Sequence, residues 1–177
     1  SMVNQKNICI AQNFVENYLF IDNLPSEKFK NFKKVKVLYL SNMDQKKGYL
    51  DLLISIEKII KSFPNSFEFN FAGSFSNKKE EENFVARIKP YSSINYHGFV
   101  DGSRKKHLLL DSHIFCLPTR YFEGQPVSIL EAYACGCAVL TTSKPGILDI
   151  FENNNNDYLI KEKSPNSIKR NLIKLMK

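Results

Sequence analysis

Two glutamates eight positions apart, Glu123 and Glu131, are the side chains whose type and spacing point most directly to chemistry. The first lies beside Gly124 in a turn, and the second lies in a segment of helical apolar spacing that begins at Pro126. Carboxylates accept hydrogen bonds from paired hydroxyl groups, and charge strengthens those bonds. The free N–H groups and the dipole at a helix start attract anions. The stretch therefore predicts an anion site at the start of this helix, with a carboxylate before it and another within it.

Apolar strand patterns alternate along the chain with segments of helical spacing. Strands are expected at 35–41, 67–72, 95–97, 113–117, 138–142 and 158–160. Helices are expected at 49–60, at 77–89, from a Ser103 cap through Leu110, from Pro126 to Gly136, at 147–151, and from Pro165 to the end. This alternation predicts an α/β fold, a Rossmann-like parallel sheet with right-handed crossovers and helices on both faces.

Ligands of such sheets bind beyond the carboxyl ends of the strands. Four conspicuous segments are expected at those ends, namely 41–48, Gly73, 98–102 and 118–126. The glutamate stretch is therefore expected to share one edge of the sheet with Lys47 and Gly73.

The length of 177 residues and the hydrophobic content of 43% indicate one globular domain with a sizeable core. We expect residues 35–177 to form this domain. Residues 1–34 are expected to be an interdomain linker or edge segment with one short strand at 7–12, ahead of which Ser1-Met2 reads as a cloning scar on part of a longer protein. No run has the length of a membrane span, and no signal peptide is evident.

Charge and cysteine content limit the classes of partner. The net charge of +7 suits an anionic partner, although a lysine-rich solvated exterior explains most of the lysines. The cysteines at 9, 116, 135 and 137 lack the spacing of a metal site or a disulfide framework. We therefore expect buried free thiols and a cytoplasmic protein.

With Gly124, Pro126, Ala134, Gly136 and the strand that follows, the Glu-x7-Glu pattern resembles that of the retaining glycosyltransferases of the GT-B fold, the family-four group. The resemblance is to their C-terminal, nucleotide-sugar-binding half and covers about Val35 to the C-terminus. It implies that the second glutamate holds the ribose hydroxyls and that the first approaches the donor sugar. It also implies that the diphosphate meets the backbone N–H groups of Gly124, Gln125, Val127 and Ser128.

Further positions resemble the family less closely. The family usually has Gly-Arg, a short gap and then Lys-Gly, with the Arg and Lys on the phosphates. Here Lys47-Gly48 is present, but Ser41-Asn42 stands in place of Gly-Arg. Asn42 can donate a hydrogen bond but brings no charge, so either Lys47 and the helix start carry the phosphates alone, or Lys46 or Arg120 helps.

The remaining donor-binding residues are expected on neighbouring loops. The resemblance implies that Gly73 admits the nucleotide because it is small, that the backbone of Phe99 or Val100 reads the base, and that Tyr121 faces the donor. Each of these positions has a plainer explanation as a turn glycine, a core residue or a surface aromatic.

The resemblance implies a retaining transferase that moves a hexose from a UDP- or GDP-linked donor to a glycan or a lipid-linked acceptor, as in polysaccharide biosynthesis. Glu123 and Lys47 would be its catalytic residues in this half, with no metal and no cofactor. The N-terminal acceptor domain would be missing, so the chain would bind donor and turn over little. A peripheral position at the inner face of the membrane is compatible with the basic charge.

Two other functions remain open at this stage. A GT-B sugar-nucleotide epimerase or a phosphorylase would have the same fold. A basic nucleic-acid-binding α/β module would need a lysine-arginine stripe with stacking aromatics, whereas the aromatics here fall mostly on apolar faces. We therefore expect no nucleic-acid partner.

Overall fold

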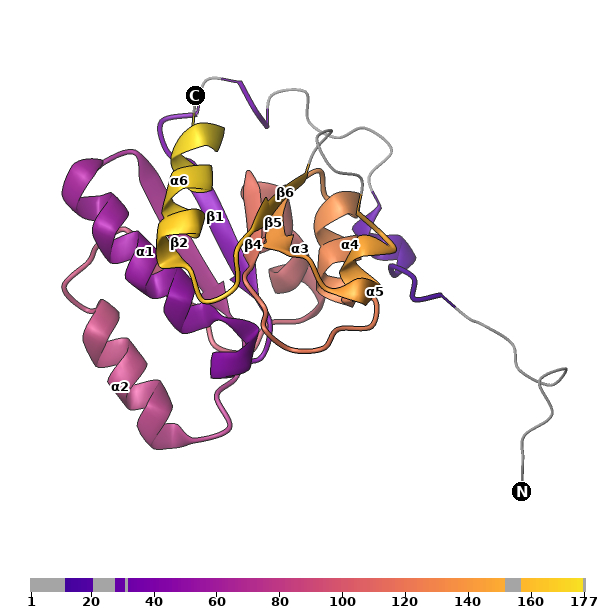
Figure 1. Cartoon of the computed structure of the whole chain (residues 1–177), viewed down its shortest axis with the longest axis horizontal. Helices are drawn as coiled ribbons and strands as arrows, with labels where there is room; N and C mark the ends of the chain where they lie inside the picture. The colour runs from indigo at the N-terminus through magenta and orange to yellow at the C-terminus, as the bar shows by residue number, and fades with distance from the viewer. Residues whose placement is uncertain (1–11, 21–27, 31, 152–156, 177) are drawn as a thin grey trace, which may run out of the picture.

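Six short strands form one parallel sheet in the order β3-β2-β1-β4-β5-β6 (Figure 1). This computed structural model describes residues 12–20, 28–30, 32–151 and 157–176. The strands are β1 (Val35–Leu40), β2 (Phe67–Ala72), β3 (Ile94–Tyr96), β4 (Ile114–Leu117), β5 (Ala138–Thr142) and β6 (Asp157–Ile160). The predicted Rossmann-like α/β fold is confirmed.

Helices cover both faces of the sheet. The α-helices are α1 (Tyr49–Ser62), α2 (Lys78–Ile88), α3 (Gly102–Asp111), α4 (Val127–Ala134), α5 (Pro145–Leu148) and α6 (Pro165–Leu175). Two short 3-10 helices, η2 (Asn17–Leu19) and η3 (Gln45–Lys47), complete the described elements. Figure 1 shows α1, α2 and α6 on one side of the sheet and α3 and α4 on the other. Because all six strands are parallel, their carboxyl ends lie at the same edge of the sheet, and the loops that lead into the helices start there.

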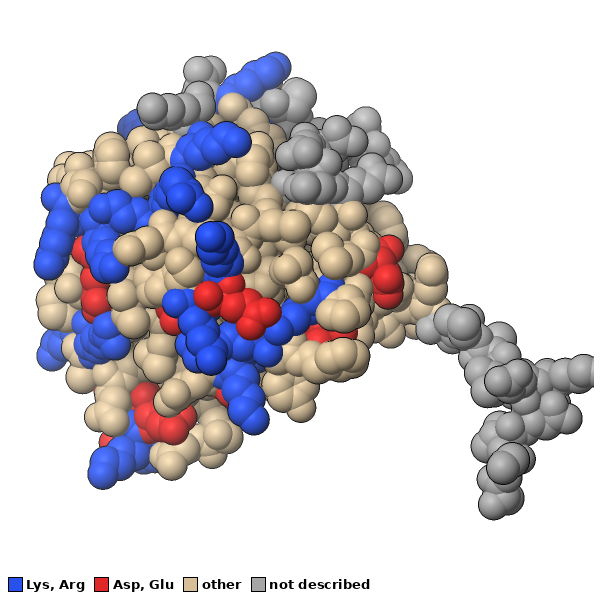
Figure 2. All heavy atoms as spheres, viewed as in Figure 1, with Lys and Arg blue, Asp and Glu red and all other residues tan. Residues whose placement is uncertain are grey.

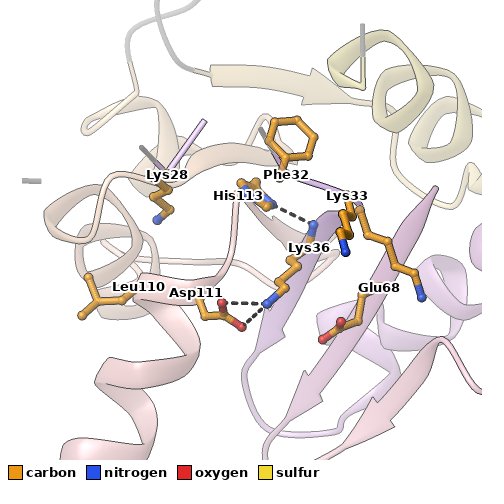
Figure 3. Close-up of a pocket in the computed structure, with 9 residues that line it drawn as sticks. Lys28, Phe32, Lys33, Lys36, Glu68, Leu110, Asp111 and His113 are labelled. Carbon is orange, nitrogen blue, oxygen red and sulfur yellow. Dashed lines mark hydrogen bonds and ion pairs between the residues drawn. The ribbon is translucent and has the colours of Figure 1, made fainter. Parts of the chain in front are cut away.

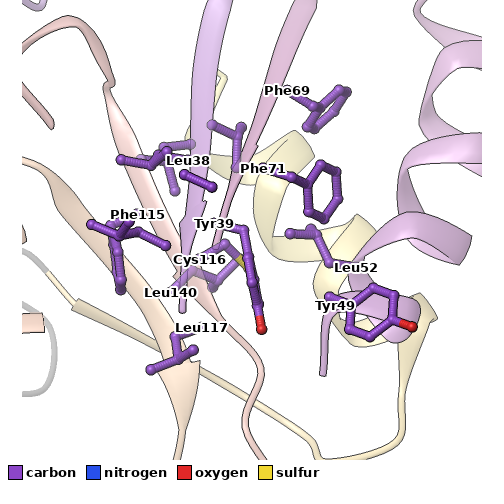
Figure 4. Packing of buried hydrophobic residues seen from close by; sticks show 14 of the residues in the cluster. Leu38, Tyr39, Tyr49, Leu52, Phe69, Phe71, Phe115, Cys116, Leu117 and Leu140 are labelled. Carbon is purple, nitrogen blue, oxygen red and sulfur yellow. The ribbon is translucent and has the colours of Figure 1, made fainter. Parts of the chain in front are cut away.

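The core forms because the central strands alternate apolar side chains toward both helical layers. Phe69 and Phe71 of β2 lie on one side of the strands with Tyr49 of α1, and Leu38 and Phe115 lie on the other (Figure 4). All five side chains are at most 4% exposed. Burying one such side chain stabilises the fold by about 1.5–3 kcal/mol, so the strands that carry the site are held firmly.

Three helix starts differ from the prediction. Ser103 does not cap α3, because the helix begins at Gly102 and Asp101 occupies the capping position. Pro126 is not the first helical residue but the one before it, since its ψ of 114° is extended. The short helix expected at 147–151 is α5, which begins two residues earlier, with Pro145 as its first helical residue.

The segment before β1 lies against the domain where it is described. Leu19 is fully buried, and its carbonyl accepts a hydrogen bond from Sγ of Cys135. The N–H and side-chain Nδ2 of Asn13 donate to the side-chain and backbone oxygens of Gln125, at 2.9 and 2.6 Å. The strand expected at 7–12 falls almost entirely outside the described residues. The division into a linker and a domain at residue 35 stays a prediction.

Basic and acidic side chains are interspersed on the face of the molecule that Figure 2 presents. Mixed surface charge of this kind is typical of a solvated exterior and supports the plainer explanation of most lysines. Among the described helices, none combines the length and the hydropathy that a bilayer span requires.

Candidate functional site

The loops that follow β1 and β4 are locked together at the carboxyl edge of the sheet. The N–H of Arg120 donates to the carbonyl of Lys46 at 2.7 Å. A Cβ on Gly48, whose φ is +85°, would lie 2.1 Å from the carbonyl oxygen of Pro118. Only glycine permits this approach, because backbone atoms cannot move aside as a side chain can. The two loops therefore form one rigid wall.

Glu123 lies in this wall and is held by two donors. The residue is 7% exposed, and Oε1 accepts hydrogen bonds from Nζ of Lys47 and from Oγ1 of Thr119, both at 2.7 Å. The N–H of Tyr121 in turn donates to Oγ1 of Thr119 at 3.1 Å. The structure thus brings together the two residues predicted to be catalytic, from loops 76 positions apart.

The β5–α5 loop closes the back of the Glu123 loop through Gly146. A Cβ on this buried glycine would lie 1.9 Å from the carbonyl oxygen of Gly124 and 2.6 Å from that of Glu123. Sequence reasoning missed Gly146, because Pro-Gly reads as an ordinary turn. Its role in holding the loop depends on two segments that are distant in the chain.

The start of α4 presents donors to the same place. Ile129 and Leu130 donate to the carbonyl of Pro126, so the first helical bonds are made. No hydrogen bond with any described residue is recorded for the N–H groups of Gly124, Gln125, Val127 or Ser128. Unpaired N–H groups at a helix start favour an anion. The predicted diphosphate donors are therefore available beside Lys47 and Glu123.

Glu131 is paired with a lysine that the sequence did not single out. It is 6% exposed, and its Oε1 accepts a hydrogen bond from Nζ of Lys105 on α3 at 2.5 Å. Burial lowers the pKa of Lys105, but the hydrogen bond and charge of Glu131 outweigh it, so the pKa is raised. Lys105 stands between Arg104 and Lys106, and nothing in the sequence distinguishes it from them. Helix packing alone selects it.

The ends of β2 and β3 form the neighbouring wall. Gly73 has a φ of +144°, and a Cβ there would lie 1.8 Å from the carbonyl oxygen of Ser41. Its N–H donates to the carbonyl of Gly98 at 2.8 Å, and its own carbonyl accepts from the hydroxyl of Tyr96 at 3.0 Å. Gly73 is thus needed for the backbone approach between β1 and β2, whatever ligand it meets.

The two residues expected to read a base differ in exposure. Phe99 is 67% exposed, whereas Val100 is 6% exposed and belongs to the core. Both follow β3, one strand beyond Gly73. Phe99 is therefore the member of the pair with an exposed side chain, and the backbone contact of either residue with a base stays a prediction.

The position expected to carry a phosphate-binding arginine is neutral. Asn42 is exposed, and its backbone carbonyl accepts a hydrogen bond from the hydroxyl of Tyr39. Arg120, a possible substitute, is bound through Nε and Nη2 to Asp51 at 3.0 and 2.8 Å. Lys46, the other possible substitute, is exposed.

Tyr121 lies against both lysines of the β1 loop. Its ring centroid is 6.0 Å from Nζ of Lys46 and 5.1 Å from Nζ of Lys47. The ring is 48% exposed, and an aromatic face at this distance attracts ammonium groups. The lysines are therefore gathered beside the helix start that offers the free N–H groups.

The cysteines within the described residues are buried free thiols, as expected at 116, 135 and 137. Burial raises the pKa of Cys137 to about 11 and also raises the pKa of Cys116, so these thiols stay protonated. Cys9 lies outside the described residues. Within the described ranges, no three His, Cys, Asp or Glu side chains gather as a metal ion would require.

Comparison with known proteins identifies the class. Residues 20–177 match the profile of the family described as Glycosyl transferases group 1, so the chain belongs to this family. The amylovoran biosynthesis glycosyltransferase AmsK of Erwinia amylovora is 25% identical over 80% of this chain and 36% of its own length. The chain spans less than half the length of the curated relatives it matches.

Solved structures share the fold. The C-terminal domain of the group 1 glycosyl transferase LpcC from Francisella tularensis has a TM-score of 0.68 at 22% identity, over 89% of this chain and 84% of that domain. Anabaena HepE, solved with UDP and glucose, has a TM-score of 0.69 at 16% identity, over 82% of this chain and 39% of its own. At these identities the likeness concerns the fold.

Proposed function

We propose that this chain is the donor-binding half of a retaining glycosyltransferase that moves a hexose from a UDP- or GDP-linked sugar to a glycan or a lipid-linked acceptor. One observation carries the proposal. Glu123 and Glu131 are both more than nine-tenths buried, each is ion-paired to a lysine, and they flank the free N–H groups at the start of α4. Buried carboxylates held in this way suit a ligand with several hydroxyl groups and a diphosphate.

Each residue then has a distinct role. Glu131 accepts from the ribose hydroxyls, and Glu123 accepts from hydroxyls of the donor sugar. Lys47 and the N–H groups of Gly124, Gln125, Val127 and Ser128 bind the diphosphate and stabilise the charge that develops as it leaves, which is commonly the largest catalytic contribution. Because Asn42 brings no charge, Lys47 and the helix start carry this charge, and Lys46 is exposed in the same loop.

The wider proposal concerns the whole protein. The proposed sugar transfer requires neither a metal nor a cofactor. An N-terminal acceptor domain completes the active site, so the chain alone binds donor and turns over little. Gly73 and Phe99 line the nucleotide side, and Tyr121 lies over Lys47. The names of AmsK and of HepE with UDP support a polysaccharide product and a UDP-linked donor. A cytoplasmic enzyme at the inner membrane face fits such a product.

Calorimetry with UDP and GDP tests the proposal. We expect one nucleotide to bind, with an affinity at least tenfold lower in the Glu131→Ala and Lys47→Ala variants, since each loses a charged contact of about 1.5–3 kcal/mol. Lys79→Ala, an exposed lysine on α2, is the matched control and should bind as the parent does. Equal binding by all four proteins would remove the assignment of both residues.

A further inference from the structure

A charged cavity opens at the amino edge of the sheet, away from the loops that hold Glu123 and Glu131. Its volume is about 610 Å³, and four lysines line it, namely Lys28, Lys33, Lys34 and Lys36. Figure 3 shows Lys28 on one side of the cavity and Lys33 on the other, with the side chain of Lys36 turned toward Asp111. Nothing in the donor-binding proposal uses these residues.

The charges of this cavity are only partly balanced. Nζ of Lys36 binds both oxygens of Asp111 at 2.7 Å, and Nζ of Lys28 donates to the carbonyls of Leu109 and Cys135. Lys33 and Lys34 are exposed and form no ion pair with any residue that the structure describes. Two ammonium groups thus remain available to an anion, and the one further carboxylate of the lining is Glu68.

Exposed phenylalanines lie among these lysines. Five of the nine positions from 28 to 36 are lysine, none is acidic, and the two phenylalanines of the stretch, Phe29 and Phe32, are 54% and 40% exposed. Their ring centroids are 5.9 and 4.5 Å from that of His113, at tilts of 56° and 40°. His113 therefore packs against both rings, while much of their apolar surface faces water.

We propose that this surface, defined by Lys28, Phe29, Phe32, Lys33 and Lys34, docks the chain on an anionic lipid bilayer, with a headgroup phosphate in the cavity and the two phenylalanine rings at the acyl boundary. Lysines next to exposed apolar rings match the two layers of such a surface, negative outside and apolar beneath. A single-stranded nucleic acid would instead need a groove that tracks its backbone along several stacking rings.

The position of the surface fits the proposed transferase without depending on its donor chemistry. β1 and β4, of six and four residues, separate the two edges of the sheet by roughly 13–20 Å at about 3.3 Å per residue. With the amino edge on the bilayer, the donor edge faces water, from which a nucleotide sugar arrives. The inference deepens the membrane position proposed above by naming the surface responsible.

Vesicle co-sedimentation of this chain tests the docking surface. Vesicles with roughly one-quarter phosphatidylglycerol should bind the chain at about 0.15 M salt, whereas pure phosphatidylcholine vesicles should not. The Lys33→Gln/Lys34→Gln variant should bind about 30-fold more weakly, which corresponds to two lysines at the usual strength near an anionic surface. Phe29→Ser/Phe32→Ser should also weaken binding, and the exposed pair Lys78→Gln/Lys79→Gln on α2 is the matched control.

Four results would overturn the proposal. They are equal binding to both kinds of vesicle, an equal loss in the Lys78/Lys79 control, binding of glycerol phosphate at the cavity without vesicle binding, and a stronger salt-dependent shift with single-stranded DNA than with anionic vesicles. UDP calorimetry on the Lys33→Gln/Lys34→Gln variant separates the two proposals. Loss of vesicle binding with nucleotide binding intact supports docking, whereas a parent protein that binds vesicles and no nucleotide leaves docking standing and removes the donor assignment.

Discussion

The two edges of the sheet treat charge in opposite ways. At the carboxyl edge, the side chains of Glu131 and Lys105 are 7% and 19% exposed and lie 2.5 Å apart. At the amino edge, those of Lys36 and Asp111 make a pair of similar length, 2.7 Å, but are 30% and 43% exposed. Ion pairs of similar length therefore lie in different environments, and burial rather than distance distinguishes the pair at the carboxyl edge from the pair at the amino edge.

The difference arises from how the chain returns to each edge. At the carboxyl edge, Gly48, Gly73 and Gly146 let backbone segments approach so closely that a Cβ would lie within 2.1 Å of a carbonyl oxygen. The amino edge is instead a cavity bordered by the segment that leads into β1. Substitutions at the first edge should therefore alter stability and binding together, whereas substitutions at the second should alter surface binding alone.

The largest effect is expected from Gly146→Ala at the carboxyl edge. Its Cβ would meet the carbonyl oxygen of Gly124, and backbone must shift to relieve this contact. We expect a loss of about 3 kcal/mol in unfolding free energy, a fall of roughly 6–12 °C in melting temperature, and at least tenfold weaker nucleotide binding. Thermal melts and UDP calorimetry measure these changes.

Gly124→Ala is the control for this prediction, because nothing lies within 4 Å of its added Cβ. Its melting temperature should equal that of the parent. If Gly146→Ala melted at the same temperature as Gly124→Ala, the inferred close packing of Gly146 against the Glu123 loop would be wrong.

An intermediate effect is expected from breaking one ion pair at each edge. Lys105→Met leaves the buried carboxylate of Glu131 without its lysine and should cost about 2 kcal/mol, while Lys36→Met at the exposed pair should cost no more than about 0.5 kcal/mol. Urea denaturation of both variants gives the comparison. Adding Glu131→Gln to Lys105→Met should restore part of the loss, and equal costs at the two edges would contradict the contrast drawn from burial.

The smallest effect depends on pH. Burial, followed by the hydrogen bond and charge of Glu81, raises the pKa of Tyr96 to about 12, and burial also raises the pKa of Tyr39 and Tyr49 near the same edge. The folded state holds the phenol proton more tightly than the unfolded state does. The contribution of this proton to folding stability is therefore complete below pH 10 and declines as pH rises toward 12. We expect Tyr96 to contribute about 1 kcal/mol to this decline, since its ring is only partly buried.

Urea denaturation of the parent and of Tyr96→Phe between pH 8 and about 12 isolates this contribution. At pH 8 the variant should differ only by the lost hydrogen bonds to Gly73 and Glu81. The gap should then narrow at alkaline pH. A gap that stays constant to pH 12 would show that the phenol proton of Tyr96 is not held by the fold.

Much of the architecture was readable because local patterns and the sheet agree. The apolar alternation of 67–72 predicted the strand that the structure shows as β2, and the lysine-glycine pair before Tyr49 lies where α1 begins. Helix starts were less readable. Asp101 and Ser103 both have side chains that can cap a helix, and the backbone at Pro126 could have been helical or extended, so the local sequence leaves each start undefined by one or two residues.

The sequence by itself determined the class of fold and the two glutamates, because helical and strand periods are local and the Glu-x7-Glu spacing lies within one turn and one helix. The sequence also singled out Lys47 through the family resemblance, but the tertiary structure alone decided that Lys47 pairs with Glu123 and that Lys105 pairs with Glu131. Lys47 reaches Glu123 across 76 positions and Lys105 reaches Glu131 across 26, and each stands beside another basic residue that does not pair with a glutamate of the motif. Long-range packing selects among equivalent side chains by burial and orientation, and neither property is written in the local sequence.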